Sequence, residues 1–449
     1  MSNYGTMLLS RVLDDATTQP LKKHHVEPSH FISEADRQAY DFILKYEREN
    51  GATPSYATVV TEFPNFFYSP GVDDSYTYLT RKLKGESAVS EFVNFVGSGE
   101  LERVVNDHKA NPSEMFDEIK KRMESIDNRT SVRDNIGTDI AKDSASFLDE
   151  YKRRKAGESF KLWRSKFPQI NDTIGGYYSG NMYTWYARSG RGKSVITMTE
   201  AIEAACQGAT VLVWAMEMSR FEWMARAYSM LSAMRGYISE TIKGIDYTIG
   251  FENNAMLSGN LTEEYEKAFR VFLLELEEGR VLKGRIILRA ADDREFMNRN
   301  VGALEADIIA SEADVVVVDP IYLMDFEANT SKTAGGDVAN TSKLIRRMAG
   351  YTGTTIHVIT QADEVKDDTD EDGNRELRPP KRAEIKKTKA VLEDAANVFG
   401  IDSLGDRAKI EIGKGRNGGE GTEVEVLYLP NFGLVEQLVK PGSANEFDF

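Results

Sequence analysis

Residues Ala187 to Ser194 read ARSGRGKS and contain the side chains that a phosphate-binding loop needs. Such a loop requires small residues, so that backbone N–H groups converge on phosphate oxygens, a lysine for the β and γ phosphates, and a hydroxyl for magnesium. Gly190, Gly192, Lys193 and Ser194 supply these groups. A chance glycine-rich turn is the alternative, but the strand-like MYTWY before the segment and a helix after it favour the phosphate site. The predicted cofactors are ATP and Mg²⁺, and the remaining loop residues expected to contact nucleotide are Ala187, Ser189 and Arg191.

Two carboxylates follow apolar runs that are expected to be strands. Asp319 ends VVVVD, where an ATPase needs a carboxylate to hold its magnesium ion, although an ordinary strand-ending Asp would fit the same position. Glu217 follows VLVWA, a strand expected to neighbour the strand of the phosphate loop. A carboxylate there can polarise the water that attacks the γ phosphate, and an exposed loop Glu is an equally good reading of its position alone.

Further polar residues follow later strand-like runs. Gln361 comes after IHVI, and its side chain both donates and accepts hydrogen bonds, as a sensor of the γ phosphate must. Lys414 and Arg416 lie two apart at the end of KIEI, so their side chains are expected to point the same way. Two cations projecting together suit an arginine finger offered to the nucleotide of a neighbouring subunit, and an exposed basic hairpin is the alternative.

These residues need an α/β framework. From about residue 160, short apolar runs alternate with helical stretches, which predicts a mostly parallel sheet with helices on both faces. KIEI and VEVLYL are separated by RNGGEG and predict a closing hairpin. The first 130 residues are predicted to be helical, as shown by Ser33 to Asn50, where apolar residues recur at helical spacing between a serine cap and Gly51. We expect a helical domain at 1–128, a linker with a docking helix at 129–159, and an ATPase domain at 160–449.

Length, charge and composition limit the class of protein. The 449 residues suit two globular units. A single cysteine excludes an intrachain disulfide and a cysteine-rich zinc site. The sequence lacks a long apolar run and begins without the features of a signal peptide, so we expect a cytoplasmic protein without a membrane partner. The net charge of -16 argues against a surface that is basic throughout, but a local basic channel remains compatible with it, since acidic residues 363–376 precede a basic stretch at 378–389.

The ordered set of motifs resembles the DnaB-type replicative DNA helicases, a hexameric branch of the RecA-like ATPases, in a version typical of bacteriophages. The resemblance is carried by PQINDTIGGYYSGNMYTWYARSGRGKS, VLVWAMEMS, VVVVDPIYLMD, TQADE and KGRNGGEG. It implies that Glu217 is the catalytic base and that Lys414 and Arg416 act on the nucleotide of the adjacent subunit. It also implies that Arg226 lies near the nucleotide.

The same resemblance gives the basic stretch a function. PPKRAEIKKTKAVLEDAAN is similar to the family's DNA-binding loop, with Lys386, Lys387 and Lys389 at the loop positions, and the segment around Lys332 is placed like the second channel loop. The implied protein is a homohexameric helicase that moves along single-stranded DNA, with a helical collar that binds primase or a loader. The alternatives are a RecA-like filament protein that does not separate strands and a regulatory ATPase of the same fold that does not bind DNA.

Overall fold

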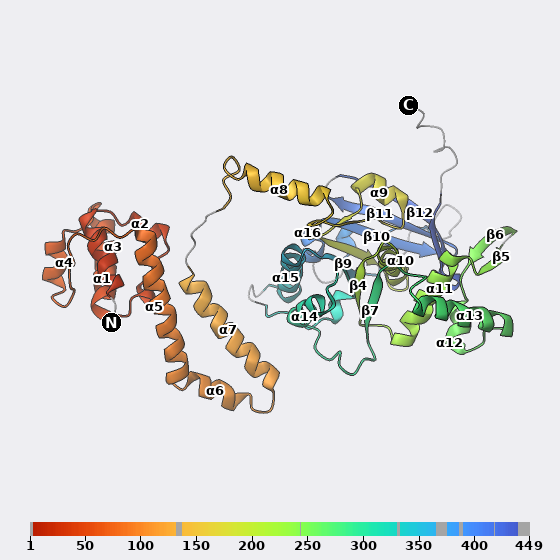
Figure 1. The fold of residues 1–449 in the computed structure, drawn as a ribbon, viewed down its shortest axis with the longest axis horizontal. Helices are drawn as coiled ribbons and strands as arrows, with labels where there is room; N and C mark the ends of the chain where they lie inside the picture. The colour runs from red at the N-terminus through yellow and green to blue at the C-terminus, as the bar shows by residue number, and fades with distance from the viewer. Residues whose placement is uncertain are drawn as a thin grey trace. The chain divides into compact units, whose positions relative to one another are not determined.

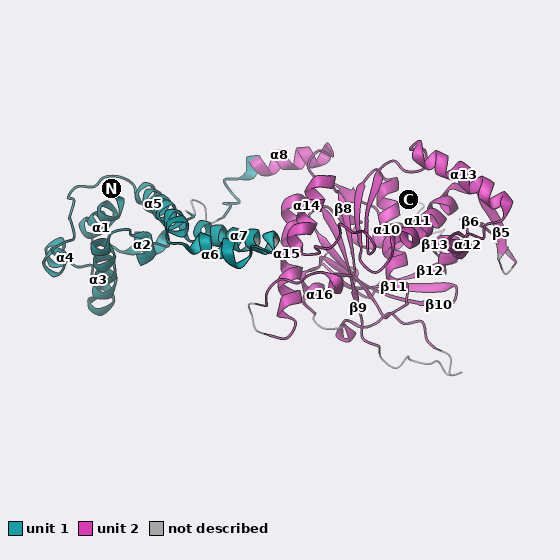
Figure 2. Ribbon diagram, turned by 90° about the horizontal axis from the view of Figure 1, so that it is seen from below, with its two compact units in different colours: residues 1–145 teal, residues 146–449 magenta. Residues whose placement is uncertain are grey.

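The computed structural model describes residues 3–131, 137–242, 244–329, 333–364, 375–385, 389–416 and 418–438. These residues form two compact units, 1–145 and 146–449 (Figure 2). The boundary lies at the start of helix α8 (Ser144–Lys155), which matches the helix expected in the predicted linker. The assignment of 129–159 as a linker stays a prediction.

The first unit is helical, as predicted. Its third helix begins after Ser33, whose hydroxyl accepts a hydrogen bond from the Asp36 N–H, and ends at Gly51, which has a φ of 70° that glycine adopts without strain. The apolar faces of the amino-terminal helices pack into one core. The helices of this unit are α1 (Tyr4–Asp14), α2 (Gln19–Lys23), η1 (Pro28–His30), α3 (Glu34–Asn50), α4 (Tyr56–Glu62), α5 (Tyr76–Gly97), α6 (Glu100–Asp107) and α7 (Pro112–Thr130).

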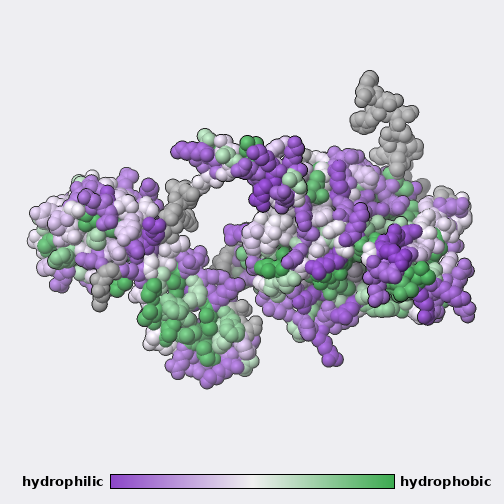
Figure 3. Space-filling model, in the orientation of Figure 1, coloured by the Kyte–Doolittle hydropathy of each residue, from purple (hydrophilic) through white to green (hydrophobic). Residues whose placement is uncertain are grey.

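The second half of α5 and the helices after it carry an apolar surface that this unit does not cover. Figure 3 shows apolar residues gathered on this part of the unit. We call this set the hairpin patch, and its exposed members are Val89, Phe92, Val93, Val96, Val105 and Phe116. Contiguous exposed apolar patches on a protein usually mark interaction surfaces.

The second unit is built on a nine-stranded sheet of order β13-β12-β11-β10-β3-β9-β8-β4-β7 (Figure 1). The six strands from β10 to β7 are parallel, and β11, β12 and β13 extend the sheet as antiparallel strands. The sheet strands are β3 (Met182–Ala187), β4 (Thr210–Ala215), β7 (Arg285–Ala290), β8 (Val315–Asp319), β9 (Thr355–Gln361), β10 (Asn397–Leu404), β11 (Arg407–Gly415), β12 (Glu423–Leu429) and β13 (Leu434–Gln437). The expected α/β fold with a mostly parallel sheet and a closing hairpin is thus confirmed.

Helices cover both faces of this sheet, because its strands are apolar on both sides. One face packs against α9, α10, α11 and α13, and the other against α14, α15 and α16. The helices of this unit are α9 (Pro168–Ile174), α10 (Lys193–Cys206), α11 (Arg220–Arg235), α12 (Asn253–Ser258), α13 (Glu263–Glu277), α14 (Val301–Ser311), η2 (Ile321–Leu323), α15 (Gly336–Thr352), η3 (Arg382–Glu384), α16 (Ala390–Asp394) and η4 (Pro430–Phe432). Two small two-stranded sheets pair β1 (Leu162–Trp163) with β2 (Tyr177–Tyr178), and β5 (Ile238–Ile242) with β6 (Ile245–Ile249).

Strand β10 occupies a central position that its sequence, NVFGIDSL, does not reveal. The strand contains Asp402, which is fully buried. Its carboxylate forms an ion pair with Arg375 and accepts a hydrogen bond from the Arg378 N–H at 2.8 Å. These partners satisfy a charge that would otherwise exclude the segment from the middle of a sheet.

Candidate nucleotide-binding site

The phosphate loop joins the carboxyl end of β3 to the amino end of α10, which begins at Lys193. The unpaired N–H groups and the helix dipole make this end of α10 favourable for an anion. Gly190 and Gly192 have φ values of 66° and 92°, which residues with a side chain rarely adopt. A Cβ atom at Gly192 would also lie 3.0 Å from the hydroxyl oxygen of Tyr428, so this glycine permits close packing of the loop on β12.

Asp319 lies where the sequence predicts it, at the carboxyl end of β8. Burial raises the pKa of its carboxyl to about 6, while the hydroxyl of Ser194 hydrogen-bonds to the carboxylate and opposes this increase. Its Oδ1 atom is buried and has no hydrogen-bond partner among the described residues. A divalent cation would satisfy that oxygen.

These groups fit Mg²⁺ that arrives with a nucleotide. Among the described residues, no cluster of three or more His, Cys, Asp or Glu could hold a metal ion alone. Magnesium is commonly held by one or two carboxylates together with substrate phosphates, so Asp319 and Ser194 would form the protein side of the site.

Glu217 faces the phosphate loop. Its Oε2 atom lies 3.9 Å from the Nζ atom of Lys193, and its Oε1 atom accepts a hydrogen bond from the hydroxyl of Tyr322. The side chain of Glu217 is 38% exposed, so a water molecule can reach it. Tyr322 lies in η2, directly after the Asp319 strand, and sequence reasoning did not identify it.

The route by which Glu217 reaches the loop differs from the expected one. We expected β4 to neighbour β3, but β8 and β9 lie between them. Each crossover helix sets strand order through packing that the sequence of the strand does not encode. Glu217 reaches the site because β4 pairs with β8, which places Ala215 opposite Asp319.

Arg226 lies on α11, and its charge acts on Asp319, Glu222 and Tyr428. Its Nε atom is buried and has no hydrogen-bond partner among the described residues, so this cation faces the site without being neutralised there. Burial raises the pKa of Tyr428 to about 12, which keeps its hydroxyl protonated. Tyr428 is a second site residue that sequence reasoning missed.

Gln361 ends β9 directly beside the phosphate loop. Its Cα pairs with that of Ala187 in the parallel ladder, and the N–H of the following residue, Ala362, donates to the Ala187 carbonyl at 3.0 Å. The structure thus brings Gln361 together with Ala187, Lys193, Ser194, Glu217 and Asp319 at one end of the sheet.

Lys414 and Arg416 lie at the opposite end of the sheet. Lys414 pairs with Val398 near the start of β10, and the start of β10 pairs with the start of β3. The Nζ atom of Lys414 donates to the carbonyls of Leu392, Glu393 and Ala395 at 3.2, 2.7 and 3.0 Å. Arg416 is exposed and contacts Asn181 at 3.4 Å. The two cations are therefore remote from the phosphate loop of their own chain.

Among the predicted DNA-contacting residues, Lys389 is exposed at the start of α16. Lys332, Lys386 and Lys387 lie outside the described residues. Lys389 borders a pocket of about 490 Å³ that is lined mainly by long polar side chains. Its lining residues are Arg382, Ala383, Lys389, Leu392, Glu393 and Lys414.

A largely parallel sheet with a phosphate loop at the carboxyl end of one strand and a buried aspartate at the end of another defines the RecA-like P-loop ATPase fold. Residues 149–362 match the AAA domain family. Among solved structures, the chain is similar to a DnaB-like replicative helicase studied for its interactions with primase, with a TM-score of 0.65 and 12% identity. That likeness covers 98% of this chain and 100% of the helicase chain.

A second solved structure, the ATPase domain of another protein, has a TM-score of 0.51 and 13% identity over 68% of this chain and 100% of its own. At these identities the likeness establishes the fold, and the predicted resemblance is confirmed at that level. No curated protein sequence matches the chain. None of the described helices is long and apolar enough to cross a membrane.

Proposed function

We propose that this protein is an ATP-driven replicative DNA helicase of the DnaB type, which moves along single-stranded DNA and separates the duplex at a replication fork. One observation carries the proposal: Lys193, Glu217 and Asp319 form an ATPase constellation in a chain whose fold follows a replicative helicase over 98% of its length.

The residues divide the work of hydrolysis. Lys193 and the loop N–H groups neutralise charge that develops on the phosphates, and Glu217 accepts a proton from the attacking water. Magnesium, when bound with ATP, bridges the phosphate oxygens and stabilises their negative charge. Gln361 lies at the neighbouring strand end, where it detects whether the γ phosphate is present.

The active assembly is a homohexamer. Arg416 is exposed at the end of the sheet opposite its own phosphate loop, so a role as an arginine finger requires the nucleotide of a neighbouring chain. The site of an isolated chain lacks that charge, and closed rings of identical subunits supply it at every interface.

Helix α8 provides an additional contact between subunits. Its apolar side chains Phe147, Leu148 and Tyr151 are 75%, 50% and 55% exposed, and α8 has no buried residue. Four consecutive cations, residues 152–155, follow this face. An amphipathic helix with an unpaired apolar face requires a partner surface.

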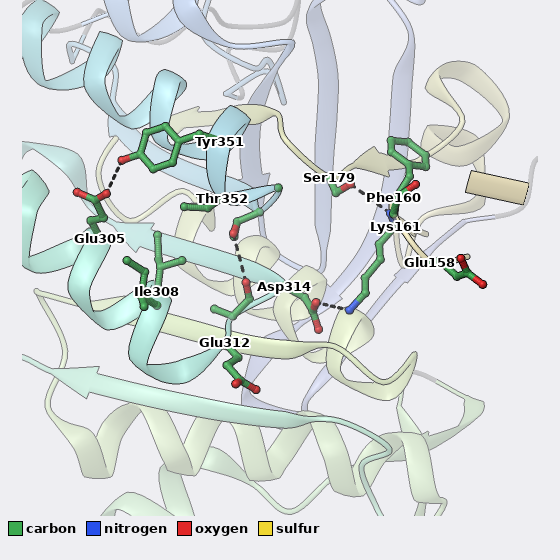
Figure 4. Close-up of a pocket in the computed structure, with 15 residues that line it drawn as sticks. Glu158, Phe160, Lys161, Ser179, Glu305, Ile308, Glu312, Asp314, Tyr351 and Thr352 are labelled. Atoms are coloured by element: carbon green, nitrogen blue, oxygen red, sulfur yellow. Dashed lines mark hydrogen bonds and ion pairs between the residues drawn. The ribbon is translucent and has the colours of Figure 1, made fainter. Parts of the chain in front are cut away.

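A pocket of about 690 Å³ beside α14 and the end of α15 offers that surface (Figure 4). Ile308 and Ile309 contribute apolar lining, and the acidic side chains of Glu158, Glu305 and Glu312 also line it. These carboxylates complement the cations of α8, so we assign α8 of one subunit to this pocket on the next.

Single-stranded DNA lies in the central channel of the ring. The basic segment with Lys386, Lys387 and Lys389, together with Lys332, grips its phosphates, because motors that track a backbone use cations without reading sequence. The outer surface stays acidic, in keeping with the net charge of -16.

The helical amino-terminal unit forms a collar and docks primase or a helicase loader. The hairpin patch supports this role, since it presents apolar side chains that the unit leaves exposed (Figure 3). The protein acts in the cytoplasm, which is the host cytoplasm for a helicase encoded by a bacteriophage.

The proposal is tested by ATP hydrolysis with and without single-stranded DNA. We expect DNA to stimulate the wild type and the Lys193→Ala variant to be inactive under both conditions. A triple change of Lys386, Lys387 and Lys389 to Ala should preserve basal hydrolysis, weaken DNA binding, and lower the logarithmic salt slope by about 0.7 per lost phosphate contact. A wild type that neither binds DNA nor responds to it contradicts the helicase assignment and favours a regulatory ATPase.

A further inference from the structure

A buried ion pair connects the phosphate loop to the chain segment that leads into the basic residues. Arg188, the second residue of ARSGRGKS, is only 2% exposed, and its Nη2 atom donates to Oε2 of Glu384 at 2.8 Å. The other carboxylate oxygen accepts from both terminal nitrogens of Arg378, at 3.2 and 3.3 Å. Glu384 thus lies between two guanidinium groups, one of which belongs to the phosphate loop.

Backbone contacts run parallel to this pair. The end of β9 continues into Ala362, which forms a β-bridge with Ile385 and also donates to the Ala187 carbonyl at 3.0 Å. The N–H of Asp363 donates to the Glu384 carbonyl at 2.6 Å. The chain that leaves Gln361 therefore lies between the phosphate loop and residues 384–385.

The far side of the basic segment is also anchored. Helix α16 begins directly after Lys389, and Lys414 holds its carboxyl end through three carbonyl contacts. Lys414 is two residues from Arg416, the proposed finger. The described residues on the two sides of 386–388 are therefore attached to the chain's own phosphate loop and to the strand that carries the finger.

We propose that the Arg188–Glu384 pair couples the nucleotide to the DNA grip, and that Arg188 and Glu384 are positioning residues for the basic segment. This inference rests on the proposed helicase function. An unpaired charge is costly in a buried site, so a shift of the phosphate loop carries Glu384 with it rather than breaking the pair. Glu384 lies two residues before Lys386, so such a shift changes where the basic residues begin.

Glu384→Gln in the full-length protein tests the coupling, because it preserves the shape of the side chain and removes its charge. We expect basal ATP hydrolysis to stay unchanged, while stimulation by oligothymidylate falls at least about fivefold, the lower range of typical coupling between sites. The affinity for oligothymidylate should become similar with a nonhydrolysable ATP analogue and with ADP. Glu384→Asp, which retains the charge, should recover part of the difference. Glu376→Gln changes an exposed carboxylate of the same segment and should behave as the wild type.

Two results overturn the coupling while leaving the helicase assignment intact. One is a Glu384→Gln variant with wild-type stimulation and wild-type nucleotide dependence of DNA affinity. The other is loss of basal hydrolysis in proportion to stimulated hydrolysis, which would show that the pair only maintains the shape of the phosphate loop. A wild type without DNA-stimulated hydrolysis refutes the proposed function and this inference together, and that failure is visible without any variant.

Discussion

At the scale of single residues, the candidate site depends on three side chains that the sequence predicts and one that it does not. Lys193, Glu217 and Asp319 come from separate segments and meet at one end of the sheet. Tyr322 holds one oxygen of Glu217 by a hydrogen bond, which leaves the other oxygen near Lys193. A general base must be oriented as well as ionised, so Tyr322 limits the positions that Glu217 occupies.

Glu217→Gln should bind ATP and Mg²⁺ normally but lower kcat by roughly 10²–10⁴-fold, because the amide preserves shape and cannot accept the proton of water. Nucleotide binding measured by calorimetry and turnover measured by phosphate release separate the two effects. Loss of nucleotide binding in this variant would identify Glu217 as a structural residue instead.

Tyr322→Phe should lower kcat by about tenfold with little change in KM, since a hydrogen bond to a charged group contributes about 1.5–3 kcal/mol and acts here on the base. The same change in the Glu217→Gln background should have little further effect, because both alter one interaction. Equal losses in the two backgrounds, measured as steady-state ATP hydrolysis, would show that Tyr322 acts independently of Glu217.

At the scale of elements, helix α10 carries Lys193 at its start and a buried carboxylate, Glu200, two turns later. Burial raises the pKa of Glu200 to about 7, although the carboxylate accepts hydrogen bonds from the Ser165 hydroxyl at 2.6 Å and the Lys166 N–H at 3.1 Å. These contacts attach the helix to the segment that precedes α9. The protonation of one side chain therefore affects how firmly the helix of the phosphate loop is held.

Wild-type stability should decrease between about pH 4.5 and pH 8 through Glu200, because its pKa is raised in the folded state and the proton is retained more strongly there than in the unfolded chain. The contribution is fully present below pH 4.5 and lost as pH rises through about 7. It amounts to about 3 kcal/mol at most.

Glu200→Gln stays uncharged, so it should gain stability relative to the wild type as pH rises. Urea unfolding of both proteins at pH 5 and pH 8 measures the change. A difference between the two proteins that is the same at both pH values would mean that Glu200 does not titrate in this range.

The elements that could be predicted from sequence are those specified by local pattern. The runs at β3, β4, β7, β8 and β9 are continuously apolar, as strands buried on both faces must be. Strand β10 was missed because Asp402 interrupts its apolar pattern and is satisfied by arginines from another segment. The order of strands and the roles of Tyr322 and Tyr428 depend on packing between distant segments, which local pattern does not contain.

At the scale of the whole molecule, the two ends of the sheet have different tasks. The phosphate loop, Glu217 and Asp319 lie at one end, and Arg416 lies at the other. One chain presents a nucleotide site without its finger and a finger without its nucleotide. Head-to-tail contact in a ring would bring each finger to the next site.

Mixtures of Arg416→Ala and Lys193→Ala subunits should hydrolyse more ATP than either variant alone. At equal mixing, roughly a quarter of the interfaces in a ring would join an intact loop to an intact finger. Because a finger contributes about 10³–10⁵-fold to phosphoryl transfer, these interfaces should dominate turnover. Absence of recovery in oligomers shown to be mixed would place Arg416 outside the site of the neighbour.

The central claim, that ATP hydrolysis drives strand separation, is tested most directly by displacement of a labelled strand from a forked DNA duplex. The account predicts that the wild type releases the strand with ATP and Mg²⁺, and that neither the wild type with ADP nor Lys193→Ala with ATP does so. A wild type that hydrolyses ATP on single-stranded DNA but leaves the fork intact, while pairing homologous strands, would contradict the account and identify a strand-exchange filament.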